Sequence, residues 1–213
     1  MNITEQQIID NYEKHMLAIR IRVQSYIFAM QQMDNNQLTL NWGHDVEVLY
    51  LQCRMICEHL IYALAVANAK DYTVENIIFG NDNHLLQEWN IVRICKKLKS
   101  INKNYFPDSA KWTAEGNLES KNTMTVERFI EIYEQCGKML HAHKIGKYNF
   151  TGSKDDIRTM VNEVDGFIKE LCSLLNVHIT NTAFSSEKII CEIIDNKPLV
   201  RVYFTKVIKQ SDD

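Results

Sequence analysis

Apolar positions recur with a helical period along most of this chain. The first segment opens with Thr4 and Gln7, which have the spacing of a capping box. Apolar residues then follow at alternating intervals of four and three positions: Tyr12, Met16, Ile19, Val23, Tyr26, Met30 and Met33. This pattern predicts one long helix from Thr4 to about Met33, with an apolar stripe held for three heptads.

The second periodic segment, residues 45–68, is apolar on nearly every side. A helix of that kind is typical of the middle of a bundle, because each of its faces can be buried against a neighbour. Its longest uninterrupted apolar run, Leu60–Ala67, has eight residues. That is far below the roughly 20 residues that span a bilayer, so we expect no membrane segment.

Further helical patterns cover a short stretch at 73–79 and longer ones at 83–103, from 123 or 125 to 146, and at 153–175. Between them, residues 108–123 are rich in polar and small types and show no clear period. Loops of that length in compact domains are usually functional or mobile. We therefore expect 108–123 to be a long loop and the least ordered internal segment.

After Asn176 the helical period gives way to short runs typical of strands, at 177–180, 188–194 and 199–207. Asp195–Pro198 has the composition of a hairpin turn. The predicted fold is mainly α, within an α+β class. A bundle of four to five helices occupies residues 1–176, and a small antiparallel β hairpin or sheet, residues 177–213, packs on it.

Composition and charge narrow the functional classes. The 213 residues are 46% hydrophobic and 24% charged, and 24 Lys and Arg stand against 27 Asp and Glu, giving a net charge of −3. A basic nucleic-acid scaffold would have the opposite sign, so any contact with RNA must be local. The first residues do not resemble a secretory signal, and the six cysteines lie in apolar segments. We therefore expect a cytoplasmic protein with reduced thiols.

The predicted central helix carries polar residues that need an explanation, because a buried charge without a partner is costly. Helical geometry places Glu47, Arg54 and Glu58 within about 40° of one another, and Gln52 and His59 together roughly 120° away. One interpretation is an i,i+4 ion pair between Arg54 and Glu58 on an exposed strip. The other is that these residues line an internal polar site.

Arg54 and His59 also form an Arg-x4-His string within "CRMICEHLIYALAVA". This segment resembles the HEPN superfamily of helical bundles, many of which are metal-independent endoribonucleases. The resemblance implies that Arg54 holds a phosphate and that His59 moves a proton during cleavage of RNA. The family usually places the motif on a late helix, whereas Arg54 lies on the second helix of this chain.

A late helix ends in a basic cluster that offers further candidates: Lys138, His141, His143 and Lys144. These residues either cap the helix and favour its dipole, or bind a phosphate. His141 and His143 lie about 200° apart on a helix and cannot share a metal ion while the helix continues. No CxxC pair or other metal-binding spacing occurs, so we expect no metal and no cofactor.

Two functions from different classes remain open. In the first, an RNA-binding or RNA-cleaving HEPN-like protein uses Arg54, His59, His141 and His143 as catalytic residues, with Glu58, Lys138 and Lys144 contacting substrate. In the second, a non-catalytic interaction or accessory protein has Arg54 paired with Glu58 and His59 buried with one hydrogen-bond partner. Because the stripe Tyr12–Met33 is longer than a short bundle core needs, we also expect a homodimer.

Overall fold

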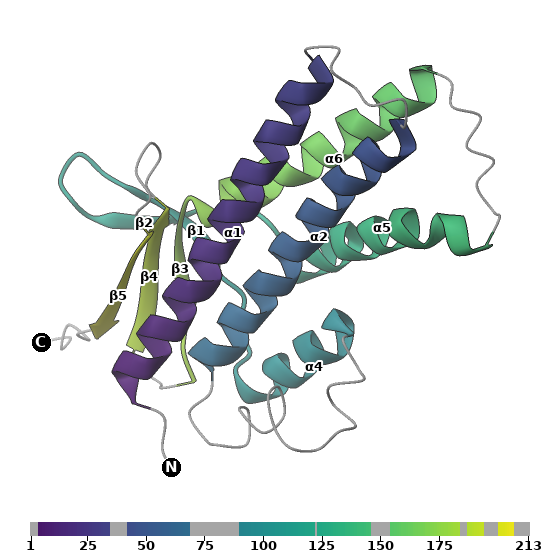
Figure 1. The fold of residues 1–213 in the computed structure, drawn as a ribbon. Helices are drawn as coiled ribbons and strands as arrows, with labels where there is room; N and C mark the ends of the chain where they lie inside the picture. The colour runs from purple at the N-terminus through teal and green to yellow at the C-terminus, as the bar shows by residue number, and fades with distance from the viewer. Residues whose placement is uncertain are drawn as a thin grey trace, which may run out of the picture.

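The structure is a computed structural model that describes residues 4–34, 42–68, 90–121, 123–145, 154–183, 187–193 and 200–206. Within these ranges the protein is mainly helical. The helices are α1 (Glu5–Asp34), α2 (Trp42–Ala67), α4 (Ile91–Ile101), α5 (Val126–Ile145) and α6 (Lys154–Leu175). A small antiparallel sheet lies beside them (Figure 1). The predicted short helix at 73–79 lies outside the described residues.

α1 begins and buries its residues as the sequence predicts. Thr4 and Gln7 form the reciprocal capping box, with the Gln7 amide donating to Thr4 Oγ1 at 3.2 Å and the Thr4 amide donating to Gln7 Oε1 at 2.8 Å. Four residues of the predicted stripe (Tyr12, Met16, Ile19 and Tyr26) are buried, together with Ile8. Val23, Met30 and Met33 pack against the same core. The whole stripe is therefore used inside the chain, so it no longer supports the expected homodimer.

α2 is the central helix, as its nearly continuous apolar sequence predicts. It packs against α1, α4, α5 and α6 (Figure 1). Among the described helices, its Gly43–Ala67 portion is long and apolar enough to cross a membrane. Most of that portion is buried inside the protein, which is the usual condition of a core helix in a folded domain.

α4 is shorter than the sequence pattern predicts. The Asn90 backbone is extended, with φ −90° and ψ 99°, and its side chain accepts a hydrogen bond from the Val92 amide. Asn90 is therefore an N-cap, and a helix running without a break from 83 to 103 is ruled out. The apolar period continued upstream of the cap in sequence, but a capping Asn competes with the helix for its own backbone.

The expected loop at 108–123 is instead a β-hairpin, so that prediction is wrong. Strands β1 (Asp108–Trp112) and β2 (Leu118–Lys121) pair antiparallel, with Trp112 opposite Leu118. Gly116 supplies the positive φ of 79° that the turn requires. The alternation of side chains is weak because both strands are short and mostly exposed, which hid them from a search for hydrophobic periods.

The hairpin joins the strands that follow α6. These are β3 (Val177–Asn181), β4 (Glu187–Ile193) and β5 (Val200–Lys206), and the sheet order is β2-β1-β3-β4-β5, all antiparallel. The three C-terminal strands confirm the predicted change of period after Asn176. The turn predicted at 195–198 lies outside the described residues. The sheet thus takes strands from two separate parts of the chain.

A buried polar contact ties α1 to the sheet. Tyr12 Oη lies 2.8 Å from His178 Nε2 and 2.8 Å from Thr180 Oγ1 on β3. His178 Nδ1 lies 2.9 Å from the Leu175 carbonyl oxygen, so Nδ1 carries the proton and Nε2 accepts the Tyr12 hydroxyl. All three side chains are fully buried, and this contact fixes the sheet against the first helix.

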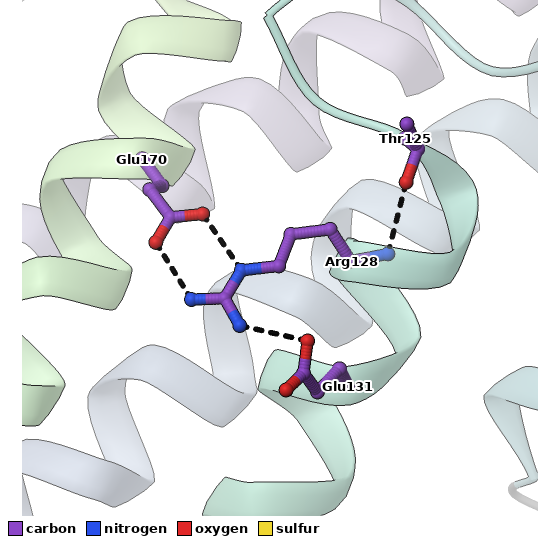
Figure 2. A network of polar contacts seen from close by, with 4 residues as sticks. All are labelled: Thr125, Arg128, Glu131 and Glu170. Atoms are coloured by element: carbon purple, nitrogen blue, oxygen red, sulfur yellow. Dashed lines mark hydrogen bonds and ion pairs between the residues drawn. The ribbon is translucent and has the colours of Figure 1, made fainter.

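A charged network joins α5 to α6 at the start of α5. Thr125 caps the helix by accepting a hydrogen bond from the Arg128 amide at 3.1 Å, as predicted for a helix starting near 123 or 125. The Arg128 guanidinium donates to both Glu170 oxygens, at 2.9 and 2.7 Å, and to Glu131 at 2.8 Å (Figure 2). Carboxylates of both helices thus hold the Arg128 guanidinium, which is typical of a structural clamp.

Candidate functional site: a polar cluster around α2

Arg54 is held by residues of α2 and α5. Its Nε donates to Glu58 Oε1 at 3.0 Å, one turn along the same helix, and its Nη2 donates to Tyr133 Oη at 2.9 Å. The guanidinium lies over the Tyr133 ring, 4.8 Å from the ring centroid. Tyr133 Oη also lies 3.4 Å from Glu58 Oε1. Arg54, Glu58 and Tyr133 therefore form a closed triangle of contacts between the two helices.

Gly137 makes room for this triangle. It lies one turn after Tyr133 on α5, and a Cβ added there would be 3.3 Å from Arg54 Nη1. That distance is tighter than an ordinary van der Waals contact, so any side chain at 137 would press on the guanidinium. The absence of a side chain lets Arg54 lie flat against α5.

His59 turns towards α1. Its Nδ1 lies 3.4 Å from His15 Nδ1, and the two rings are 5.7 Å apart between centroids. The His15 ring also contacts Tyr62, again at 5.7 Å. Two turns before His59 on the same side of α2, Gln52 accepts a long hydrogen bond from Arg22 of α1, at 3.4 Å. This second group of residues lies at the seam between α1 and α2.

Burial keeps both histidines of the seam neutral at pH 7. It lowers the pKa of His15 to about 4, with a further contribution from His59, and it lowers the pKa of His59, with a further contribution from Arg22. Glu58 opposes this by raising the pKa of His59. A neutral imidazole has one acceptor nitrogen, so the ring that donates in the His15–His59 contact keeps its acceptor at Nε2, whereas the ring that accepts has none left for a proton.

The structure does not direct Arg54 and His59 to a common point. Arg54 contacts Tyr133 on α5, whereas His59 contacts His15 on α1, so the two side chains leave α2 towards opposite neighbours. Glu58 lies between them and influences both electrostatically. The two polar faces predicted on α2 are thus confirmed, and each of them meets a different helix.

The candidates on the late helix are only partly described. α5 extends to Ile145, so the backbone of His141 and of His143 belongs to one continuous helix. Lys138 is exposed. The side chains of His141, His143 and Lys144 lie outside the described residues.

The described residues contain no group of three or more His, Cys, Asp or Glu side chains that could hold a metal ion. The six cysteines are free thiols, and five of them are buried. Burial raises the pKa of the Cys95 thiol to about 11 and raises that of Cys191 as well, so these thiols stay protonated and unreactive.

Sequence reasoning missed the partners that complete the cluster: His15, Tyr62, Tyr133 and Gly137. His15 lies on α1 next to the apolar stripe, and the stripe alone gave no reason to expect a polar contact there. Tyr133 and Gly137 belong to the apolar period of α5, and that period predicted only that they pack in the core. Helical spacing identifies partners within one helix, but the pairing of two helices depends on how they dock.

No protein-family model, curated protein or solved structure matches this chain.

Proposed function

We propose that this chain is a non-catalytic helical interaction protein in which Arg54 and Glu58 serve the fold. The observation that carries the proposal is that the Arg54 guanidinium already donates hydrogen bonds to other side chains of the protein. Nε and Nη2 are used by Glu58 and Tyr133, and Nη1 lies against Gly137. A phosphate-binding arginine offers its planar fork of donors to the ligand, whereas Nε and Nη2 of Arg54 already donate to Glu58 and Tyr133. We propose as well that the helices are arranged as the four- to five-helix bundle predicted from the sequence.

A second candidate, RNA binding or metal-independent RNA cleavage of the HEPN kind, is favoured by one observation. His15 and His59 are two neutral imidazoles at a helix seam that is not fully buried, with Arg22 nearby. A neutral histidine next to a cation can take the proton of a 2′-hydroxyl. His141, His143, Lys138 and Lys144 would then supply further contacts to the phosphate.

One assay separates the two functions. The purified chain is incubated with a labelled single-stranded RNA in EDTA, alongside the variants His59→Ala and His44→Ala. His44 is an exposed histidine on the same helix and serves as the matched control. We expect no cleavage by any of the three proteins.

Cleavage that survives EDTA, is retained by His44→Ala and falls about 10²–10⁴-fold in His59→Ala would establish the second function instead.

The structural role of Arg54 has its own readout. Arg54→Ala leaves the half-buried Glu58 carboxylate without its cation, so we expect unfolding to become easier by about 1–3 kcal/mol. Removing both charges, in Arg54→Met with Glu58→Gln, should recover part of that loss. An Arg54→Ala variant with an unchanged melting temperature would contradict the proposal.

A further inference from the structure

His15 of α1 and His59 of α2 face each other across the seam between the two helices, which pack side by side (Figure 1). Their Nδ1 atoms lie 3.4 Å apart, and the two rings are tilted by 44°. Both side chains are half-buried, so the pair is not sealed from solvent. Two ring nitrogens from distant parts of the chain thus meet at a point that a small ion can reach.

The separation of the two nitrogens matches that of two ligands on one metal ion. An imidazole nitrogen binds Zn²⁺ at about 2.0–2.1 Å, so two such ligands in a tetrahedral site lie about 3.3–3.4 Å apart. A hydrogen bond with an N–H donor usually spans only about 2.7–3.2 Å. The distance of 3.4 Å is therefore long for a hydrogen bond but right for a shared ion, and no movement of either helix is needed to reach it.

We propose that His15 and His59 together bind one divalent transition-metal ion of the zinc class through their Nδ1 atoms, joining α1 to α2. Imidazole nitrogen suits Zn²⁺, Ni²⁺ and Cu²⁺, whereas Mg²⁺ and Ca²⁺ take oxygen ligands. Each ring then carries its proton on Nε2. The ring that donates through Nδ1 in the metal-free contact therefore changes tautomer, and no proton is released. This ion site goes beyond the proposed function and does not rest on it.

Both rings are in the protonation state that an ion requires. A histidine binds a metal only when it is neutral, and protons compete with the ion when the pKa lies near the working pH. Burial lowers the pKa of His15 to about 4, with further contributions from His59 and Lys14. Burial also lowers the pKa of His59, where Arg22 adds to the effect and Glu58 opposes it. Protons therefore do not compete with the ion at pH 7.

Two features limit the affinity of the pair. In the part of the chain that the structure describes, no third His, Cys, Asp or Glu completes a metal-binding group, so water fills the remaining positions on the ion. The positive charges of Arg22 and Lys14 oppose a cation. The neighbouring Glu58 carboxylate is already paired with Arg54. We therefore expect a dissociation constant of about 1–100 µM, far weaker than that of a structural site with four protein ligands.

Isothermal titration calorimetry of the full chain with ZnCl₂ at pH 7 tests the site, because it measures binding to the folded protein directly. We expect wild type to bind one ion per chain, and His15→Asn and His59→Asn each to weaken that binding at least about tenfold, because each leaves a single protein ligand. His44→Asn is the matched control, since His44 is an exposed histidine on the same helix as His59, and it should bind as wild type does. MgCl₂ should produce no binding heat.

The two histidine variants must act alike, because both ligands hold the same ion. Binding that stays within about twofold of the wild-type constant in either His15→Asn or His59→Asn overturns the proposal, as does a wild type that binds no Zn²⁺ below about 1 mM.

If a variant does not fold, NMR of the wild type decides. A stoichiometric amount of Zn²⁺ should shift the ring signals of His15 and His59 and leave both rings protonated at Nε2, while the ring signals of His44 stay in place. Ring signals of His15 and His59 that do not respond to Zn²⁺ overturn the proposal. None of these outcomes depends on the RNA assay or on the stability of the Arg54 variants, so failure of the ion site is distinguishable from failure of the proposed function.

Discussion

Single residues in this protein act through their neighbours on other helices. Arg54 has one partner that its own helix supplies, Glu58, and another that docking supplies, Tyr133. Gly137 illustrates the same dependence, because the lack of a side chain there matters only for a group on α2. Glycine inside a helix is otherwise unfavourable by about 1 kcal/mol relative to alanine, so this one needs a reason.

Gly137→Ala should reveal that reason in a double-mutant cycle. In wild type the added methyl group meets Arg54 Nη1 at 3.3 Å, and we expect the usual gain in helix stability to be lost. In an Arg54→Ala background the same change should stabilise the protein by about 1 kcal/mol in urea unfolding.

Gly166→Ala on α6 is the control, because a Cβ there meets nothing within 4 Å. It should be stabilising in both backgrounds. Equal effects of Gly137→Ala with and without Arg54 would show that the glycine does not serve the guanidinium.

At the scale of elements, helices are joined by side chains that the helical period does not single out. The Arg128 network links the first turn of α5 to α6 through a two-pronged contact with Glu170 (Figure 2). The guanidinium also lies over the Phe167 ring, 5.4 Å from its centroid. The contact with Arg128 lowers the pKa of Glu170, so the pair contributes stability at neutral pH that is lost in acid.

Arg128→Ala should lower the free energy of unfolding by about 1 kcal/mol, because the network is partly exposed and screened by water. Arg128→Lys keeps the charge but cannot reach both carboxylate oxygens, and should recover less than half of the loss. Chemical denaturation measures both.

Lys111→Ala provides the comparison. It removes a single-pronged pair with Glu119 between two well exposed side chains of the β1–β2 hairpin, and we expect almost no change. Should Arg128→Lys equal wild type, the two-pronged geometry would have no energetic importance.

The whole molecule depends on contacts between its helical part and its sheet. Tyr12 of α1 and His178 and Thr180 of β3 form the buried polar contact, and Tyr12 lies more than 160 residues from both of its partners in sequence. Burial lowers the pKa of His178 to about 4 from the usual 6.5, although its bond to the Leu175 carbonyl opposes the shift. His178 is therefore neutral in the folded protein at neutral pH.

The lowered pKa of His178 determines the direction in which the stability of the protein changes with pH. Between pH 6.5 and 4, His178 is protonated in the unfolded chain but stays neutral in the folded chain. The free energy of unfolding therefore falls as the pH is lowered through that range. The expected slope is about 1.4 kcal/mol per pH unit for this one group. His15, with a pKa of about 4, should act in the same direction.

Unfolding at a series of pH values should therefore show a flatter profile in His178→Gln than in wild type. If His178→Gln does not fold, proton NMR of the wild type decides, because the His178 ring signals should not titrate above pH 5. A ring that titrates near 6.5 would refute the assignment.

Several features followed from the sequence alone because they depend on neighbours along the chain. The capping box at Thr4, the buried stripe of α1, the apolar circumference of α2 and the Arg54–Glu58 spacing are properties of a helix of period 3.6, wherever that helix is placed. The alternation after Asn176 likewise predicted strands before their partners were known.

Tertiary structure decided the rest, because it depends on contacts between distant parts of the chain. β1 and β2 are too short and too exposed to show a period, and they become strands by pairing with each other and with β3. The direction in which Arg54 and His59 leave α2 was set by where α5 and α1 dock, and docking brought Tyr133 to the one and His15 to the other. Local periodicity determines which face of an element is buried, whereas the residues that meet across that face are chosen by packing.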